Sequence, residues 1–319
     1  MRKVAITGGC GFVGSNLAMK LSHGRYSVVV VDDLSTGIPS NIANLSNIDF
    51  VNISILDYNR LKESIKDCEA VFHLGARGSV PRSLLNPRAT HEVNATGTLN
   101  VLQAARESGS HVIFSSSSSV YGRNTDLPKT EDMWLGPMTP YAASKLSAEA
   151  YVQAYSSSFG VPTTLLRFFN IYGPRQRPDH QYAAVIPKWI WSAMNGREIE
   201  VFGDGETTRD FTYVDTVVEI LISAMENKRT TKGPVNLAFG NRISLNSIVH
   251  LLKQEFPDLK VKHKDPRPGD VRDSQNSPNL IKELFPEVEP IEFEEGFKKT
   301  MAWLMEHGES IANGPETLD

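Results

Sequence analysis

A tyrosine and a lysine four residues apart, Tyr141 and Lys145 in "TPYAASKLSAEAYV", have the spacing and chemistry for proton transfer. On a helix, residues at i and i+4 share a face, so their side chains meet. A phenol with a pKa of about 10 is a poor base at neutral pH, but a neighbouring ammonium favours its ionised form. The spacing predicts that Tyr141 is a general base assisted by Lys145. The pattern alone is common, and an exposed tyrosine and lysine on a helix surface explain most occurrences.

Five consecutive serines, residues 115–119, make this interpretation more specific. They follow the apolar run "HVIF" and precede "VYG", so they are expected at the end of a strand. There they would offer hydroxyl groups to an oxygen atom of a substrate. A polar strand end or a flexible linker is the alternative, and the apolar residues on both sides argue against a linker.

A glycine-rich turn, "TGGCGFVG", lies near the amino terminus between an expected strand at residues 3–6 and a helix that includes residues 15–21. The spacing of Gly8, Gly11 and Gly14 suits a tight turn, close approach to a pyrophosphate, and a helix–strand contact. Asp32 ends the next strand, where a carboxylate can accept hydrogen bonds from a ribose diol and would repel a 2′-phosphate. The turn therefore predicts NAD rather than NADP. The alternative is a purely structural strand–helix turn.

The composition excludes several classes of protein. The 319 residues carry 40% hydrophobic and 22% charged residues, with a net charge of −4. These values are typical of a globular protein, and with no basic run a nucleic-acid partner is not expected. The sequence has no apolar run of about 18 residues, so no membrane span is expected. Cys10 and Cys68 lack metal-ligand spacing, so no metal is expected, and a reducing cytoplasm is the expected location.

Strands alternate with helices over the first half of the chain. Apolar runs such as "YSVVVVDDLSTG", "AVFHLGA", "HVIFSSSSSVYG" and "TTLLRFFNIYG" are separated by helices expected at residues 94–108 and 141–159. This pattern predicts an α/β fold, a Rossmann-type doubly wound parallel sheet. Later loops rich in Pro, Gly, Arg and Asp predict a second, smaller carboxyl-terminal α/β domain. We expect an NAD-binding domain at residues 1–169 plus 212–239 and the smaller domain at 170–211 plus 240–312, with "VDTVVEILISAM" and "PVNLAFG" returning to the sheet as a helix and a strand.

In order along the chain, these motifs resemble those of the extended short-chain dehydrogenases/reductases, and specifically the nucleotide-sugar 4-epimerases related to UDP-galactose 4-epimerase. The resemblance runs from Arg2 to about Trp303. It rests on "TGGCGFVG", "VDDLSTG", "FHLGA", "HEVNATGTLN", "SSSSSVYG", "YAASK", "RFFNIYGPRQRP", "FGDGETTRDFTYV" and "RPGDVRDS". It implies a UDP-sugar substrate, with residues 170–211 plus 240–312 as the nucleotide-sugar-binding (substrate-binding) domain, and a homodimer formed through the helices at residues 94–108 and 141–159.

The resemblance also implies three sets of site residues. Tyr141 would be the general base, Lys145 would hold the nicotinamide ribose, and Ser117 would hydrogen-bond the sugar 4-oxygen. NAD would contact Gly8, Gly11, Phe12, Val13, Gly14, Asp32, Asp33, Ser35, Thr36, Gly37, Ser54, Ile55, Leu74, Gly75, Ala76, Asn94, Ser115, Tyr141, Lys145 and Phe168. The nucleotide sugar would contact Gly78, Ser79, Ser117, Ser118, Ser119, Asn170, Ala184, Val185, Trp189, Val201, Phe202, Arg209, Arg267, Asp270 and Ser274. Ser54 departs from the family pattern, which usually has an aspartate facing the adenine amino group.

The resemblance leaves several reactions open after hydride removal from C4. A 4,6-dehydratase usually has an Asp-Glu pair directly after the position of Ser117, and this chain has Ser118 and Ser119 there. We recognise no carboxylate-handling set of the kind that a decarboxylase would need. NAD-dependent, redox-neutral 4-epimerisation of a UDP-sugar is therefore the expected activity. A nucleotide-sugar dehydratase, a UDP-uronic acid 4-epimerase and an NAD-binding regulatory protein are the alternatives.

One position bears on the sugar. Epimerases restricted to glucose and galactose carry a tyrosine at one wall of the sugar pocket, where this chain has Ser274. A serine leaves room for an N-acetyl group at C2, and the small residues Gly78 and Ser79 fit the same subgroup, as does "YAAVIPKW". We therefore expect interconversion of UDP-N-acetylglucosamine and UDP-N-acetylgalactosamine, with or without UDP-glucose and UDP-galactose. The alternative is that Ser274 is an ordinary polar loop residue.

Overall fold

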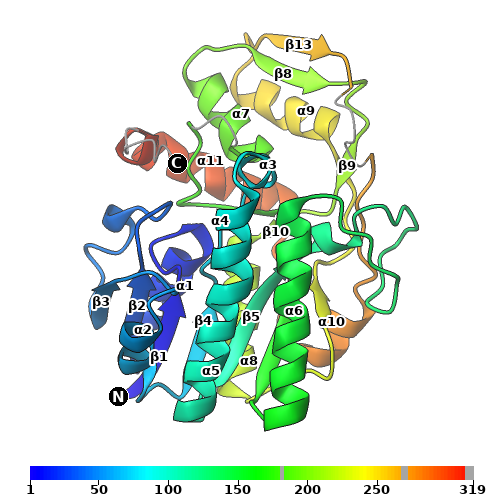
Figure 1. The fold of residues 1–319 in the computed structure, drawn as a ribbon. Coiled ribbons are helices and arrows are strands. Elements are labelled where there is room, and N and C mark those ends of the chain that lie inside the picture. The colour runs from blue at the N-terminus through cyan, green and yellow to red at the C-terminus, as the bar shows by residue number, and fades with distance from the viewer. Residues whose placement is uncertain (180–182, 267–271, 313–319) are drawn as a thin grey trace.

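Seven parallel strands form the central sheet, in the order β11-β6-β5-β4-β1-β2-β3 (Figure 1). The computed structural model describes residues 1–179, 183–266 and 272–312. The strands are β1 (Arg2–Thr7), β2 (Tyr26–Asp32), β3 (Ile48–Asn52), β4 (Ala70–His73), β5 (His111–Ser117), β6 (Thr163–Phe168) and β11 (Val235–Leu237). The expected doubly wound parallel sheet is confirmed, including the return of residues 235–237 to its edge.

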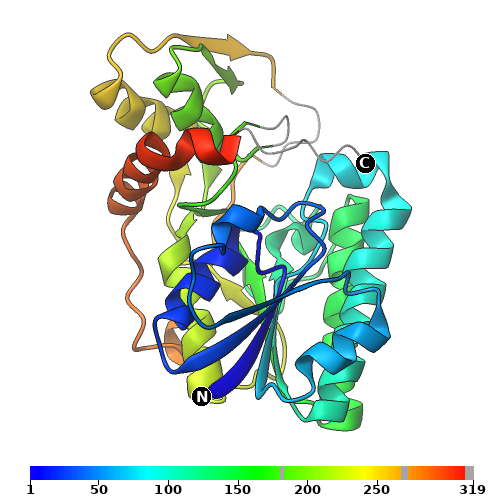
Figure 2. The ribbon, with the colours of Figure 1, turned by 90° about the vertical axis from the view of Figure 1, so that its left-hand side faces the viewer.

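Helices cover both faces of this sheet, as a quarter-turn of the molecule shows (Figure 2). One face packs against α1 (Phe12–Ser22) and α8 (Val214–Glu226), and the other against α2 (Tyr58–Ile65), α5 (Gly97–Ser108) and α6 (Pro140–Phe159). Because both faces are covered, the inner strands carry continuous apolar runs, as in "VVVV" of β2. The short helices α3 (Val80–Leu85) and α4 (Pro87–His91) and a π-helical turn (Glu92–Thr96) lead into α5. Two 3-10 turns, Pro39–Asn41 and Ser118–Tyr121, follow β2 and β5.

The remaining elements lie mostly beyond the carboxyl ends of the central strands, in the upper part of Figure 1. They are β7 (Ile171–Tyr172), α7 (Val185–Met194), β8 (Ile199–Phe202), β9 (Thr208–Arg209), β10 (Thr212–Tyr213), β12 (Ile243–Ser244), α9 (Leu245–Glu255), β13 (Val261–Lys264), α10 (Asn279–Leu284) and α11 (Phe293–Ala312). Pairs β7–β10 and β8–β13 are parallel, and β9–β12 is antiparallel. The segment α10 instead packs beside β11, at the edge of the central sheet.

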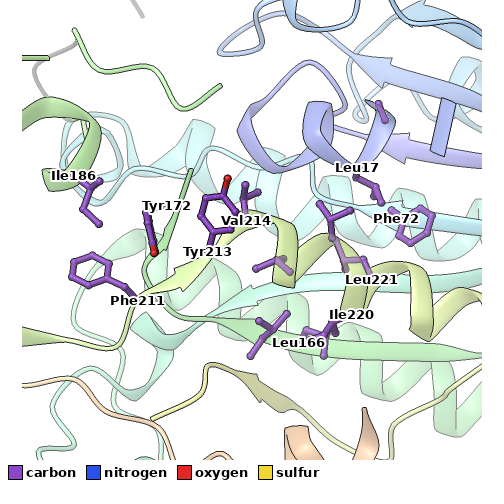
Figure 3. Packing of buried hydrophobic residues seen from close by; sticks show 14 of the residues in the cluster. Leu17, Phe72, Leu166, Tyr172, Ile186, Phe211, Tyr213, Val214, Ile220 and Leu221 are labelled. Carbon is purple, nitrogen blue, oxygen red and sulfur yellow. The ribbon is translucent and has the colours of Figure 1, made fainter. Parts of the chain in front are cut away.

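An aromatic cluster joins this second region to the sheet. Tyr172 packs edge-on against Phe211 at 5.9 Å between ring centroids and against Tyr213 at 5.6 Å (Figure 3). The Tyr172 hydroxyl donates a hydrogen bond to the Phe293 carbonyl at 2.9 Å, which ties α11 to the same cluster. Buried aromatic rings with a satisfied hydroxyl contribute a large apolar area at one point. This cluster therefore fixes the loops of the second region above the sheet edge that carries the site.

Candidate active site

Strand β5 and helix α6 bring the catalytic candidates together. The Lys145 ammonium donates a hydrogen bond to the Ser115 carbonyl at 2.7 Å, and the Ser117 hydroxyl hydrogen-bonds the Tyr141 phenol. Thr139 caps the start of α6 by accepting from the Ala142 amide, with Pro140 in the first turn, so Tyr141 stands at the helix end beside the carboxyl end of β5. The four-residue spacing then places Lys145 one helical turn further along α6, beside Ser115 of β5. The structure thus assembles the predicted trio of Ser117, Tyr141 and Lys145.

Burial governs the protonation of this pair. Lys145 is 4% exposed, and burial lowers the pKa of its ammonium to about 8, although the nearby Glu149 carboxylate raises it. Burial raises the pKa of the Tyr141 phenol, and the Ser117 hydrogen bond acts in the opposite direction. Without a ligand, Tyr141 is therefore a protonated phenol. A nearby positive charge is needed to bring its ionisation into the working range.

Asn94 has a supporting position rather than an open one. Its side-chain oxygen accepts from the Arg77 amide at 2.8 Å, and its amide group donates to the Ser144 hydroxyl at 2.9 Å. Asn94 is buried, and through these hydrogen bonds it links the loop after β4 to α6. His73 is the last residue of β4. Its ring lies between the hydroxyls of Thr7 and Thr98, and burial lowers its pKa to about 3. His73 is therefore a neutral packing residue.

The glycine turn leaves no room for larger side chains. Gly8 has φ +71°, and a Cβ there would lie 2.8 Å from Gly75. A Cβ on Gly14 would lie 2.2 Å from the Gly8 carbonyl oxygen. Gly11 caps α1 without a side-chain hydrogen bond, so the first amides of this helix are available to an anion. The turn therefore has the shape and the donors that a pyrophosphate needs.

Asp32 ends β2 beside this turn. Its two carboxylate oxygens accept from the backbone amides of Cys10 and Leu34, each at 2.9 Å. Burial raises the pKa of Asp32, and these two hydrogen bonds oppose the shift. Gly37 packs against the carboxylate, where a Cβ would lie 2.6 Å from Oδ1. A carboxylate oxygen has two acceptor sites, so Asp32 can accept hydrogen bonds from a ribose diol while it also accepts those of the two backbone amides.

A cavity of about 460 Å³ extends from the glycine turn to α3 along the carboxyl edge of the sheet. The predicted NAD residues that line it are Gly8, Gly11, Phe12, Val13, Gly14, Asp32, Asp33, Ser35, Thr36, Ile55, Leu74, Gly75 and Ala76. The predicted sugar-side residues Gly78, Ser79 and Ala184 line its other part. The predicted NAD residues outside the lining are Gly37, Ser54, Asn94, Ser115, Tyr141, Lys145 and Phe168. Ser54 instead accepts from the Leu56 amide within its own turn.

The predicted nucleotide-sugar residues are spread over several segments. Ser117, Ser118, Ser119, Asn170, Val185, Trp189, Val201, Phe202, Arg209 and Ser274 do not line the cavity. Val201 is fully buried in the hydrophobic core and Trp189 is 5% exposed, so neither presents an open side chain. The Ser274 amide donates to the Thr208 carbonyl at 3.2 Å, which places it beside β9 and Arg209. Arg267 and Asp270 lie outside the described residues.

Two buried polar atoms near the site lack a hydrogen-bond partner within the described part of the chain. They are the Ser119 hydroxyl and the side-chain oxygen of Gln176. Gln176 also lines the cavity. A buried polar atom left unpaired costs about 1–3 kcal/mol, so both positions suit a polar ligand.

The profile of the NAD-dependent epimerase/dehydratase family matches residues 4–238. The chain belongs to this family. It is similar to a putative UDP-glucose 4-epimerase of Methanocaldococcus jannaschii, with 34% identity over 94% of this chain and 98% of that protein. It is also 34% identical to a UDP-N-acetyl-alpha-D-glucosaminuronate decarboxylase of Bacillus cytotoxicus, over 96% of this chain and 98% of the other. A solved structure of UDP-N-acetylglucosamine 4-epimerase from Methanobrevibacter ruminantium, in complex with UDP-N-acetylmuramic acid, matches with a TM-score of 0.90 and 36% identity, over 96% of this chain and 99% of that one.

The residues of this NAD-dependent enzyme fit its cofactor. The glycine cradle and the uncapped start of α1 suit the pyrophosphate, and Asp32 suits the adenosine ribose. NAD is thus the cofactor, as expected. In the described ranges 1–179, 183–266 and 272–312, no group of three His, Cys, Asp or Glu side chains could hold a metal ion. No helix among these residues is long and apolar enough to cross a membrane.

Sequence reasoning missed several residues around the site. The cavity is also lined by Cys10, Val31, Ile38, Asn41, Ile53, Arg77, Val80, Pro81, Arg82, Val93, Arg175, Gln176 and Arg177. Arg175 to Arg177 fall in the quoted motif "RFFNIYGPRQRP", which could have indicated them. Asp210 was also missed: it is fully buried, and its carboxylate accepts from the Gly240 amide at 3.0 Å and the Asn276 amide at 2.8 Å. Asp210 holds the segment that carries Ser274, and burial raises its pKa to about 6.

Proposed function

We propose that this protein is a UDP-sugar 4-epimerase that interconverts UDP-N-acetylglucosamine and UDP-N-acetylgalactosamine. The observation that carries the proposal is the assembly of Ser117, Tyr141 and Lys145, with serines rather than an acid–base pair at positions 118 and 119. This set supports proton removal from a hydroxyl. It offers no carboxyl group directly after Ser117 for an elimination at C5 and C6.

In the proposed reaction, Ser117 and Tyr141 hold the sugar 4-hydroxyl between them. Tyr141, ionised with the help of the Lys145 ammonium, accepts the hydroxyl proton as the C4–H bond breaks. NAD⁺, held by the glycine turn and Asp32, would supply the hydride acceptor for C4 and a positive charge that favours the Tyr141 phenolate. The same phenol then gives the proton back to the 4-oxygen, so the cycle is neutral in protons and electrons. Return of hydride to the opposite face of the 4-keto sugar gives the epimer.

The N-acetyl preference rests on the small residues of the proposed sugar pocket. Gly78 has open space where a Cβ would lie, and Ser79 lines the cavity next to it. Ser274 is partly buried beside β9, on a segment braced by Asp210. The similarity to a UDP-N-acetylglucosamine 4-epimerase supports the same preference. A small wall admits an acetamido group, whereas a tyrosine ring would fill that space.

The experiment is to incubate the NAD-loaded protein with UDP-hexoses, UDP-N-acetylhexosamines and UDP-hexuronic acids and to identify the products by NMR. Interconversion of the two UDP-N-acetylhexosamines faster than of UDP-glucose and UDP-galactose supports the proposal. An unsaturated sugar would indicate a dehydratase, and loss of carbon dioxide would indicate the chemistry of the decarboxylase relative. Turnover of the uronic acids alone would indicate a uronic acid epimerase. NAD binding with no turnover at all would favour a regulatory protein.

Ser274→Tyr tests the sugar preference within the same assay. We expect it to lower kcat/KM for the acetylated pair by about 10- to 200-fold through steric exclusion, with little effect on the unsubstituted pair. Ser274→Ala is the matched control, because it removes the hydroxyl without filling the space. Equal loss of both pairs in Ser274→Tyr would show that Ser274 is not the gate.

We further propose that residues 1–169 plus 212–239 form the NAD-binding domain, that residues 170–211 plus 240–312 form the nucleotide-sugar-binding domain, and that the protein is cytoplasmic. A homodimer through α5 and α6 is supported by two large apolar side chains on α6, Tyr151 at 40% and Phe159 at 48% exposure. Sedimentation velocity of the wild type and of Tyr151→Glu tests the dimer, since a charge in a buried interface would dissociate it.

A further inference from the structure

Three consecutive serines of β5 contact three side chains on successive turns of α6. The Ser115 carbonyl accepts from Lys145, and the Ser117 hydroxyl hydrogen-bonds Tyr141. Between them, the Ser116 hydroxyl donates to the Glu149 carboxylate at 2.5 Å. Tyr141, Lys145 and Glu149 have four-residue spacing, so they form one row along the helix. The catalytic pair therefore has a third, buried member behind it.

Glu149 is paired in an enclosed position. Its carboxylate accepts from Nε and Nη2 of Arg167 on β6, each at 2.9 Å, and both side chains are at most 2% exposed. Arg167 also donates to the Tyr121 hydroxyl at 2.9 Å, which in turn donates to Asn236 on β11. A bidentate arginine fixes the orientation of the carboxylate. The end of β5 is thus held to α6 through Ser116 and to β6 through Arg167.

Glu149, one helical turn from Lys145, is the carboxylate whose charge acts on the Lys145 ammonium. From α6 Lys145 faces Tyr141 and Glu149, from β5 the Ser115 carbonyl and the Phe114 ring at 5.0 Å, and from β4 the neutral His73. Arg167 on β6 adds a positive charge beyond the carboxylate. The Glu149 charge opposes the effect of burial on the pKa of Lys145.

We propose that Glu149 is a positioning residue for catalysis, which aligns the end of β5 with Tyr141 through Ser116 and places a buried negative charge one helical turn from Lys145. The inference rests on the proposed function in taking Tyr141 as the base, but it concerns a residue that makes no contact with the sugar. A protonated Lys145 serves two purposes in this site: it favours the phenolate, and it holds the nicotinamide ribose.

Glu149→Gln removes the charge and keeps an acceptor oxygen for Ser116. Calorimetry measures the NAD affinity as a function of pH. We expect the pH at which half of this affinity is lost, the midpoint, to be about one unit lower in Glu149→Gln than in the wild type. The alkaline limb of kcat moves by the same amount, because Lys145 loses its proton earlier. NAD binding requires no sugar, so this readout survives even if the assigned sugar is wrong. Glu107→Gln, an exposed glutamate on α5, is the matched control and leaves the midpoint unchanged.

Ser116→Ala removes the tether and keeps the charge. We expect kcat to fall about tenfold with the NAD midpoint unchanged, which separates alignment from electrostatics. Glu149→Asp keeps the charge, so it restores the midpoint of the wild type. If Glu149→Gln fails to fold because Arg167 is left unpaired, Ser116→Ala still tests the alignment, because it leaves the pair of Glu149 and Arg167 intact. A wild-type midpoint in folded Glu149→Gln, or wild-type kcat in Ser116→Ala, overturns the proposal.

Discussion

The Lys145 ammonium donates a hydrogen bond to the backbone carbonyl of Ser115 at 2.7 Å. This contact joins the middle of α6 to the carboxyl end of β5, where Ser117 meets Tyr141. Lys145 is therefore already anchored before any cofactor binds. An ammonium has three N–H groups, so two remain for the ribose hydroxyl that we propose Lys145 binds.

Replacing Tyr141 by Phe tests the base directly. We expect turnover to fall by about 10²- to 10⁴-fold or more, because the acid–base group is lost while the ring stays in place. NAD binding should be nearly unchanged. Tyr151→Phe, on the exposed side of the same helix, is the matched control and should keep full activity. Turnover of Tyr141→Phe within threefold of the wild type would contradict the assignment.

The pH dependence follows from Lys145. Burial lowers its pKa to about 8, so its charge is present below about pH 8 and is lost as the pH rises through that value. We expect kcat to decline above about pH 8 because the phenolate loses its neighbouring cation. A full pH–rate profile measures this limb. Lys145→Met should have a much lower kcat, and its kcat should no longer decline above pH 8. Lys62→Met, on the surface of α2, is the control and should keep the decline of the wild type. A profile that still rises at pH 9 would argue against a role for the Lys145 charge.

The double replacement Asp32→Ala/Asp33→Arg tests the choice of cofactor. It removes the carboxylate that repels a 2′-phosphate and supplies a cation, so we expect affinity for NADP relative to NAD to rise about tenfold or more. Asp32 also accepts the Cys10 and Leu34 amides, and its loss should lower the free energy of unfolding by about 1–3 kcal/mol. Asp33→Arg alone is the control for the added charge. If the wild type binds both cofactors equally, the ribose assignment is incorrect.

Gly14→Ala tests the cradle. Its Cβ would lie 2.2 Å from the Gly8 carbonyl oxygen, so the turn must shift away from the start of α1. We expect NAD affinity to fall by about 100-fold or more and the melting temperature to drop, as measured by calorimetry and thermal denaturation. Gly233→Ala, where a Cβ meets nothing within 4 Å, is the control and should leave both unchanged. Wild-type NAD affinity in Gly14→Ala would mean that the turn does not form the binding surface.

The local features of the site could be predicted from the sequence. The glycine turn, the four-residue spacing of Tyr141 and Lys145, and the strand end at residues 115–117 each depend on backbone geometry over a few neighbouring residues. The alternation of apolar strands and helices likewise predicts the parallel sheet, whose strand ends bring these segments to one edge. The family resemblance added further predicted NAD residues, and 13 of the 20 residues predicted to contact NAD line the cavity along the sheet edge.

The tertiary structure decided the contacts between segments far apart in the chain. The link of Ser116 to Glu149 and then to Arg167, and the hold of Asp210 on Asn276, join residues 18 to 66 positions apart. Nothing in the spacing of a glutamate or an arginine says that it will be buried or which partner will neutralise it. That outcome depends on which side chains the packed sheet and helices bring within hydrogen-bond distance, because a buried charge is stable only with such a partner. The sequence alone thus determined the chemistry available to this protein, and the packing determined which charges support it.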